Sequence, residues 1–261
     1  MNLSLHEKNA LVCGSTQGIG FAIAKELALL GANCILMARN KESLQTALAQ
    51  LHQEGTQKHE ILCADFSDTN AVKTIVNELA SNKTIHILIN NTGGPPAGKI
   101  TDAKDVDFLS ALNLHLINNH NIATAVLEGM KQVSYGRIVN IVSTSVKIPL
   151  PNLGVSNTTR AAVAAWAKTL ANEVAVNGIT VNNVLPGATS TVRLSSIIEN
   201  KSNKTGAEIK TVEAEMLHEI PMRRFGLAEE IAAMAAFLTT PAAAYITGQS
   251  ICVDGGRTGS I

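Results

Sequence analysis

Residues 9–20 read NALVCGSTQGIG, and this stretch decides the fold class. Its first five residues, Asn9–Cys13, form a short apolar run of the kind that is buried in a parallel sheet. Three glycines come next, and the helical pattern of Ile19–Leu30 begins directly after them. A strand, a glycine-rich turn and a helix in this order predict the start of a nucleotide-binding βαβ unit.

The same alternation of short apolar runs and helical stretches continues along the chain. Parallel strands need a crossover helix between them, so the alternation predicts an α/β fold with a doubly wound parallel sheet of about seven strands. With no linker or repeat to divide it, the whole chain, 1–261, is expected to be a single Rossmann domain. The predicted strands are Asn9–Cys13, Asn33–Ala38, Glu60–Ala64, Ile85–Asn90, Gly136–Val142, Thr180–Leu185 and Ser250–Val253, and helices are predicted over Ile19–Leu30, Lys41–Gln53, Thr69–Ala80 and Val106–Lys131.

Composition excludes several classes of protein. The 261 residues are 46% hydrophobic and carry 21 basic and 21 acidic side chains, so no charge surplus points to nucleic acid. The four cysteines lie in apolar runs without a CxxC spacing, and we expect reduced, buried thiols. His115 and His120 fall on different helix faces, so no metal site is expected. No targeting leader or membrane span is seen, and a cytoplasmic location is expected.

Two features indicate a cofactor. Glycines 14, 18 and 20 let the chain turn tightly and bring the helix start close to a phosphate, which the free N–H groups favour. Three glycines in seven positions can also merely shape a loop, but the flanking strand and helix favour the cofactor. Arg39 ends the second predicted strand without an acidic neighbour, which favours the 2′-phosphate of NADP(H) over the free ribose of NAD. The alternative is a solvated charge.

Several motifs, in order and spacing, resemble the short-chain dehydrogenase/reductase family, and within it the bacterial 3-oxoacyl-acyl-carrier-protein reductases. Residues 14–20 resemble the family's TGxxxGxG loop, with Cys13 in place of Thr; residues 90–93 resemble its NNAG stretch, and residues 245–256 resemble the reductases' closing run. The resemblance covers nearly the whole chain and implies NAD(P) use and a homotetramer or homodimer. The implied cofactor contacts are Gly14, Ser15, Thr16, Gln17, Gly18, Ile19, Gly20, Arg39, Asp65, Phe66, Asn91, Gly93, Arg160, Pro186, Gly187, Thr189 and Thr191.

The resemblance also implies four catalytic positions, which the family fills with Asn, Ser, Tyr and Lys. Asn113 and Ser143 match the first two. The Tyr normally follows the Ser by thirteen residues and the Lys comes four later, which here gives Ser156 and Arg160. The YxxxK motif is thus read as SxxxR. Asn113 could instead bond nearby backbone, and Ser143 could simply cap a strand end.

This change of residue types alters the available chemistry. An aliphatic hydroxyl is far less acidic than a phenol, so Ser156 donates a proton poorly. Arg160 stays cationic and cannot relay a proton, but it can bond the nicotinamide ribose or clamp a carboxylate or phosphate. Because the two positions are one helical turn apart, a coordinated redesign is favoured over decay. Lys147 and Asn152 are further candidates for substrate contacts, or are simply solvated loop residues.

Residues 190–219 are polar and helix-prone and follow a predicted strand end, so they form either a solvated insertion or a substrate-covering lid. The leading hypothesis is a divergent NADP(H)-dependent oxidoreductase, similar to the 3-oxoacyl reductases, acting on an unidentified small-molecule or acyl-thioester carbonyl or alcohol. The alternatives are a protein that binds or senses NADP(H) without chemistry, and a non-redox enzyme that uses the same cleft.

Overall fold

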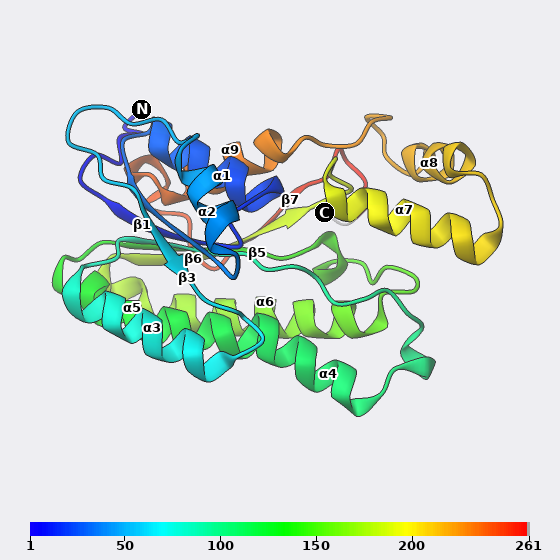
Figure 1. The fold of residues 1–261 in the computed structure, drawn as a ribbon, viewed down its shortest axis with the longest axis horizontal. Coiled ribbons are helices and arrows are strands. Elements are labelled where there is room, and N and C mark those ends of the chain that lie inside the picture. Colours follow the sequence, from blue (N-terminus) through cyan, green and yellow to red (C-terminus); the bar gives the residue numbers. More distant parts are fainter. Residues whose placement is uncertain (260–261) are drawn as a thin grey trace.

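A seven-stranded parallel sheet runs through the middle of the computed structural model, which describes residues 1–259 (Figure 1). Its strand order, β3-β2-β1-β4-β5-β6-β7, is that of a doubly wound sheet, so the predicted fold is confirmed. Three predicted strands agree with the structure residue for residue, three differ by one or two residues at one end, and β6 is one residue longer at each end. The strands are β1 (Asn9–Cys13), β2 (Asn33–Ala38), β3 (Glu60–Cys63), β4 (Ile87–Asn90), β5 (Gly136–Ile141), β6 (Ile179–Pro186) and β7 (Ser250–Val253).

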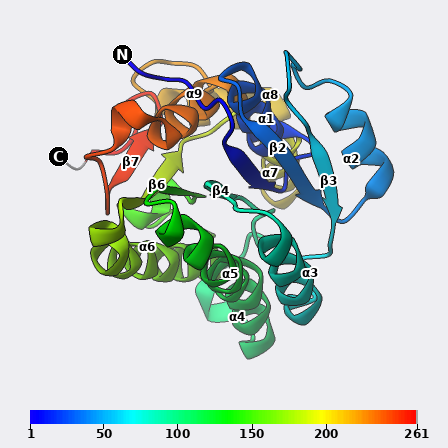
Figure 2. The ribbon, with the colours of Figure 1, turned by 90° about the vertical axis from the view of Figure 1, so that its left-hand side faces the viewer.

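Helices cover both faces of the sheet (Figure 2). One face packs on α1 (Gly18–Leu29), α2 (Lys41–Leu48) and α9 (Ala228–Thr239), and the other on α3 (Thr69–Asn82), α5 (Asn118–Gln132) and α6 (Gly154–Val174). Strands that are apolar on both faces bury a hydrophobic cluster on each side, which is why the sequence shows continuous apolar runs instead of alternation.

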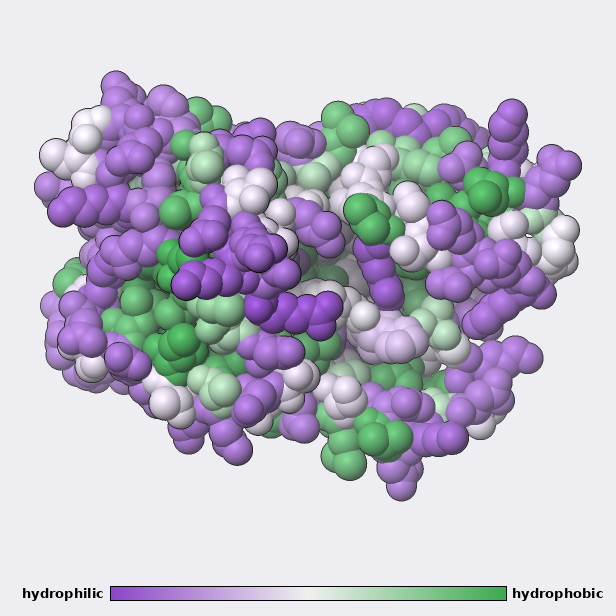
Figure 3. Space-filling view, in the orientation of Figure 1, coloured by the Kyte–Doolittle hydropathy of each residue, from purple (hydrophilic) through white to green (hydrophobic). Residues whose placement is uncertain are grey.

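The order of the strands places the site. The chain moves outward from β1 through β2 to β3, then returns to the other side of β1 as β4 and continues to β7. At this reversal the loops after β1 and β4 diverge to opposite faces and leave a crevice at the carboxyl ends of the strands. The face in Figure 3 is hollowed near its middle, in the region where Figure 1 shows strands ending beside α7 (Val192–Thr205).

The helical stretch predicted over Val106–Lys131 contains a π-helical turn. The structure has α4 (Asp105–Leu112), a π-helical turn over Asn113–Ile117, and then α5. A π-turn adds a residue to one turn of the helix and rotates the side chains that follow it, and such turns occur often at functional sites. The predicted helical stretch is therefore confirmed to within one residue at each end, and the π-turn, which the sequence did not predict, begins at a candidate catalytic residue.

Helix α4 also exposes apolar surface. Val106 is 62% and Leu109 61% exposed on it, one turn apart. A homodimer or homotetramer would cover such positions, and this assembly remains a prediction because the structure contains one chain.

The polar segment 190–219 is a pair of helices, α7 and α8 (Ile209–His218), at one end of the molecule (Figure 1). Leu194, Ile198 and Val212 form a small core of their own between them. The Lys201 ammonium and the Glu215 carboxylate pair across the two helices at 2.9 Å. The segment is thus a folded helical hairpin, and its function as a lid remains a prediction.

The expectation of four buried thiols is wrong for two of them. Cys13 and Cys34 are buried, and burial raises the pKa of each thiol to about 12. Cys63 is exposed at the end of β3 and Cys252 is partly exposed in β7, because both strands lie at the edges of the sheet, where one flank has no neighbouring strand. Within residues 1–259 no helix is long and apolar enough to cross a lipid bilayer.

Candidate functional site

The turn between β1 and α1 is a cradle of closely packed backbone. Gly14 and Gly18 have φ angles of +59° and +56°, a region that favours glycine. A Cβ on Gly20 would lie 2.2 Å from the Gly14 carbonyl oxygen. Asn91, directly after β4, donates from Nδ2 to that same oxygen at 3.1 Å. No side chain caps the start of α1, so its first N–H groups are free to face an anion.

The loop after β6 faces this cradle. The Cγ2 atom of Thr191 lies 3.5 Å from where a Cβ on Gly18 would sit. Thr191 caps α7 by accepting from the Leu194 N–H, and its hydroxyl donates to the Thr189 carbonyl oxygen at 3.2 Å. The structure therefore brings together the glycine turn and the segment running from Pro186 to Thr191, which the sequence predicted to contact the cofactor.

At the other end of the crevice, Arg39 and Asp65 are exposed at the ends of β2 and β3. The Asp65 carboxylate accepts from the Ser67 N–H at 2.9 Å. This bond lowers the pKa of Asp65, and the charge of Arg39 lowers it further by a smaller amount. Phe66 is partly buried and its carbonyl oxygen accepts from the buried Asn118 amide at 2.7 Å. A cation and a carboxylate therefore lie near each other where the ribose and adenine of a dinucleotide would lie.

Buried polar atoms without a partner gather at the same edge. An unsatisfied buried group costs about 1–3 kcal/mol, so a cluster of them indicates a ligand that completes their bonds. Five of these atoms follow strand ends or lie on the α4–α5 turn: Ser15 Oγ, Asn90 Oδ1, His115 Nε2, Asn118 Oδ1 and Ser145 Oγ. Together with the glycine cradle, they fit a bound dinucleotide and its substrate.

A row of amides fixes the carboxyl half of the sheet beneath this site. Asn90 on β4 donates to Asn140 on β5 at 2.9 Å, Asn140 donates to Asn183 on β6 at 2.9 Å, and Asn183 donates to the Ser250 hydroxyl on β7 at 3.1 Å. Each pair is directly opposite in the strand register. These cross-strand bonds favour one strand register, so this row helps to hold the loops after β4 and β5 in fixed positions.

Asn113, one of the four predicted catalytic residues, lies at the junction of α4 and the π-helical turn. It begins the π-helical turn and its side chain is exposed, whereas His115, two residues later, is 1% exposed and faces the loop after β4. The His115 Nδ1 atom shares a hydrogen bond of 2.8 Å with the Thr92 hydroxyl. Asn113 was predicted from its spacing along the chain from Asn91, and that spacing does not show which side chain of the π-turn faces inward.

Ser143, Ser156 and Arg160 lie around the carboxyl end of β5. Ser143 follows the strand, and its Oγ accepts from the Ser145 N–H at 3.1 Å, which leaves its own proton to donate. Ser156 is partly buried in the first turns of α6. Arg160, one turn later, is buried and donates from Nη1 to the Ile141 carbonyl oxygen at 3.0 Å. Ser143 and Arg160 therefore reach the same strand end from two elements.

A second arginine, which the sequence reading missed, reaches the same loop. Arg193 in the first turn of α7 donates from Nη2 to the Pro95 carbonyl oxygen at 2.7 Å. A Cβ on Gly94 would lie 3.4 Å from Nη2 of Arg193 and 3.7 Å from Nη2 of Arg160. Burial lowers the pKa of Arg160 to about 10, and the charge of Arg193 acts in the same direction. Arg160 thus remains charged near neutral pH.

The two arginines and burial also act on His115. Burial, followed by the charges of Arg160 and Arg193, lowers the pKa of His115 to about 2. The imidazole is therefore neutral across the working range of pH and cannot serve as an acid there. It can still bond a ligand through the unpartnered Nε2 atom.

This neutral histidine predicts a loss of stability on acidification. Its folded-state pKa lies below the ordinary 6.5, so the unfolded chain takes up the proton first and stability falls as the pH drops from 6.5 towards 2. We expect His115 to contribute about 2 kcal/mol of this loss between pH 7 and pH 5. Burial lowers the pKa of His86 to about 4, which adds to the loss in the same direction.

The measurement is urea unfolding at pH 7 and pH 5 for the unmodified chain and for His115→Gln. The variant should lose about 2 kcal/mol less on acidification. His120→Gln, at an exposed position on α5, serves as the matched control and should follow the unmodified chain. An identical pH dependence in all three proteins would show that His115 is not held neutral.

The two tyrosines and two further loop residues complete the set of candidates. The Tyr135 hydroxyl donates to the Thr239 carbonyl oxygen at 2.7 Å, directly before the amino end of β5, and Tyr245 is fully exposed. Lys147 and Asn152 are exposed on the loop after Ser143. Among residues 1–259 no three or more His, Cys, Asp or Glu side chains are arranged to hold a metal ion.

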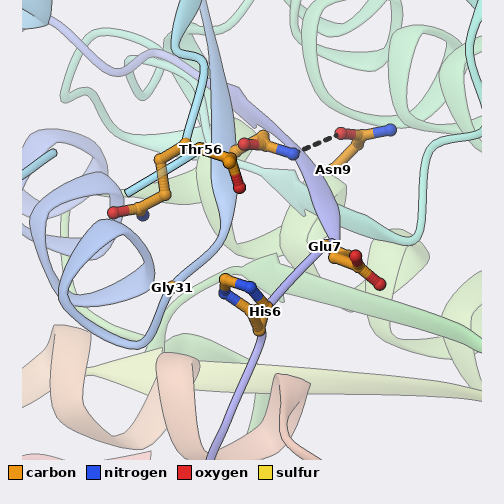
Figure 4. A pocket seen from close by; sticks show the side chains of 7 residues that line it. His6, Glu7, Asn9, Gly31 and Thr56 are labelled. Atoms are coloured by element: carbon orange, nitrogen blue, oxygen red, sulfur yellow. Dashed lines mark hydrogen bonds between the residues drawn. The ribbon is translucent and has the colours of Figure 1, made fainter. Parts of the chain in front are cut away.

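A separate hollow lies at the opposite edge of the sheet (Figure 4). It measures about 290 Å³ and is lined by residues that include His6, Glu7 and Thr56, beside Asn9 at the start of β1. Asn33 at the start of β2 donates to the Asn9 side chain there at 3.1 Å. This hollow is shallow and polar, and it adjoins the amino ends of the strands, away from the glycine cradle.

Known proteins match the chain along almost its full length. A family model described as enoyl-(acyl carrier protein) reductase matches residues 14–258. The NADPH-dependent reductase BacG of Bacillus subtilis is 31% identical over 261 residues, which cover 98% of this chain and 100% of that protein. The 3-oxoacyl-[acyl-carrier-protein] reductase FabG of Haemophilus influenzae is 33% identical over 252 residues, covering 95% of this chain and 97% of that protein.

Solved structures agree with the same fold. L-sorbose reductase from Gluconobacter frateurii, complexed with NADPH and L-sorbose, has a TM-score of 0.92 at 28% identity, with both chains covered in full. YwfH, an NADPH-dependent reductase involved in bacilysin biosynthesis, has a TM-score of 0.90 at 32% identity, covering 97% of this chain and 99% of that one.

Proposed function

This chain belongs to the short-chain dehydrogenase/reductase family, and on that basis we propose that it is an NADP(H)-dependent oxidoreductase that interconverts a carbonyl compound and an alcohol. The observation that carries the proposal is the glycine cradle between β1 and α1, where a Cβ on Gly20 would collide with the Gly14 carbonyl oxygen. The turn leaves no room for a side chain, so its backbone N–H groups and the start of the helix can approach a diphosphate closely.

Each part of the cofactor has residues that suit it. The diphosphate would lie against residues Gly14–Gly20, and the 2′-phosphate against Arg39, which has no acidic residue at the end of its own strand. Asp65 and Phe66 would border the adenine, and the segment Pro186–Thr191 the nicotinamide. Asn91 and Gly93 would border the part of the cofactor between the adenine and the nicotinamide. The space beside Gly93 is open, since no atom lies within 4 Å of its Cβ position.

We further propose that SxxxR at Ser156 and Arg160 replaces the family's YxxxK. When bound, NADPH supplies the hydride that adds to the carbonyl carbon. The Ser143 hydroxyl would donate to the carbonyl oxygen, because its oxygen accepts from the Ser145 N–H and its own proton is left to donate. With no phenol in the site, the proton that completes the alcohol would come from solvent, relayed by a water that the Ser156 hydroxyl holds and that solvent reprotonates. Arg160 would hold charge and position without transferring a proton.

The helices α7 and α8 are proposed as a lid over the nicotinamide end. They follow directly from the cofactor-facing Thr191, and Arg193 at the start of α7 already bonds the loop after β4. A folded hairpin that touches the site through one side chain can move as a unit when a substrate binds.

Cofactor selectivity gives a direct test. We expect NADPH to bind at least several-fold more tightly than NADH, because the Arg39 guanidinium can pair with the 2′-phosphate. Arg39→Asp should reverse or flatten this preference, and Lys41→Gln, a basic residue removed nearby in α2, should leave it unchanged. Calorimetric titration of both cofactors measures it. Equal affinities for NADPH and NADH in the unmodified chain would refute the assignment.

Turnover separates an enzyme from a protein that only senses NADP(H). NADPH oxidation should be followed at 25 °C with a panel of ketones, oxo acids and acyl thioesters, with the unmodified chain and Ser143→Ala in parallel. At least one substrate class should be reduced, and Ser143→Ala should slow it. Tight NADPH binding with no reduction of any class would favour the sensing function instead.

A further inference from the structure

The wall of the site around Gly94 carries two positive charges from different elements. Arg160 comes from α6 and Arg193 from α7, and their Nη2 atoms lie 3.7 Å and 3.4 Å from the same point, the Cβ position of Gly94. Like charges this close repel one another, and in a partly desolvated site the repulsion is stronger than in water.

No acidic side chain neutralises this pair. In residues 1–259, every ion pair to a lysine, arginine or histidine lies elsewhere, and neither Arg160 nor Arg193 takes part in one. Each arginine is held by a single carbonyl oxygen, that of Ile141 or Pro95. A guanidinium carries five N–H donors in a planar fork, so most of the donors remain available.

A second observation points to a ligand at the same place. His115 is 1% exposed, its Nδ1 atom is paired with the Thr92 hydroxyl, and its Nε2 atom has no partner. Thr92 begins the loop that continues through Gly94 and Pro95. A neutral, buried ring nitrogen beside two cations provides a hydrogen bond to a ligand without adding charge.

We propose that Arg160 and Arg193 form a two-arginine clamp that binds a carboxylate of the substrate, so that the preferred substrate is an oxo acid or the corresponding hydroxy acid. A carboxylate would neutralise the pair and use the two planar forks. Because Arg193 begins α7, carboxylate binding would also draw the lid against the loop after β4. The identity of the reaction rests on the proposed function. The clamp itself does not, because it is inferred from the positions of the two arginines.

The other possible source of negative charge is the cofactor's own diphosphate. Arg193 lies two residues after Thr191, whose methyl group faces the glycine turn, so a phosphate contact is within reach of the same helix start. A substrate clamp and a phosphate contact differ in what is lost when Arg193 is neutralised. The experiment therefore measures the two ligands separately.

The probes are pyruvate and its neutral methyl ester, titrated calorimetrically into protein with and without saturating NADP⁺, and NADPH titrated alone. In the presence of NADP⁺, pyruvate should bind about tenfold or more tightly than methyl pyruvate, equivalent to about 1.4 kcal/mol. Arg193→Gln should weaken pyruvate binding about tenfold and leave NADPH affinity within about twofold. Arg193→Lys should recover part of the loss, and Lys204→Gln at the far end of α7 should change neither ligand.

The possible failures are distinguishable. If Arg193→Gln weakens NADPH and leaves pyruvate unchanged, the arginine belongs to the cofactor site and the clamp is refuted. If the unmodified chain binds NADPH but has the same affinity for pyruvate and for its methyl ester, the clamp is refuted while the proposed function stands. If pyruvate binds with the expected dependence on Arg193 but NADPH does not bind, the clamp stands and the proposed function fails.

Discussion

Gly20→Ala should abolish tight NADPH binding, with a loss of roughly 100-fold or more, which corresponds to about 2.7 kcal/mol. The new Cβ would lie 2.2 Å from the Gly14 carbonyl oxygen and 2.5 Å from the Asn91 amide nitrogen. Neither is the end of a flexible side chain that can move away at little cost, because Asn91 is itself held by the carbonyl oxygens of Cys13 and Gly14. The turn must open, and the start of α1 then moves away from the phosphates.

Gly129→Ala is the matched control. Gly129 lies within α5, and a Cβ there would meet Thr84 at an ordinary 3.5 Å. Alanine in a helix interior should raise stability by about 0.5–1 kcal/mol and leave NADPH binding unchanged. The readouts are calorimetric NADPH affinity and the melting temperature of each apoprotein. A folded Gly20→Ala protein with undiminished NADPH affinity would show that the glycine turn is not the cofactor site.

The fold could be predicted from local signals that agree with one another. Each strand is a short apolar run because both faces of the sheet are covered, and each crossover contains a helix because parallel strands require one. The edge strand β3 ends at Cys63, one residue earlier than predicted, and leaves that thiol exposed. Apolar character alone does not show which strand has a free flank, because strand order depends on contacts between distant segments.

The site was less accessible to the same reasoning. The glycine turn and Arg39 are found from sequence because their chemistry is local to one loop or strand end. His115 was missed because Asn113 was chosen by its spacing along the chain from Asn91, which does not show that the π-turn buries His115. Arg193 gives no local signal at all, since a single arginine in a polar helix is typical of solvated surface. What distinguishes Arg193 from a surface arginine is that its Nη2 atom lies 3.4 Å from the Cβ position of Gly94, and this closeness arises only in the folded chain.

Arg160→Ala should weaken the binding of NADPH or of a carboxylate ligand by about 1.5–3 kcal/mol, the contribution of hydrogen bonds to a charged group, or roughly 10- to 150-fold. The truncation removes a charge from the carboxyl end of β5 and also leaves the Ile141 carbonyl oxygen without its side-chain donor. Arg160→Lys separates charge from shape, because lysine keeps the cation and loses the planar fork. It should retain part of the NADPH affinity and lose most of the preference for pyruvate over its methyl ester.

The double variant Ser156→Tyr with Arg160→Lys then decides how the site arose. If the SxxxR change had merely disabled an ordinary ketoreductase, the restored phenol and ammonium should reduce acetoacetyl thioesters at a substantial rate. We expect little gain, because the tyrosine ring would occupy the space in front of the two arginines and the lysine would lose the two-point contact. Arg193 would also remain as a cation beside a neutral thioester, with no group to pair with. Robust thioester reduction by the double variant, together with undiminished ligand affinity in Arg160→Ala, would mean that the site is a damaged reductase and that Arg160 has no binding function.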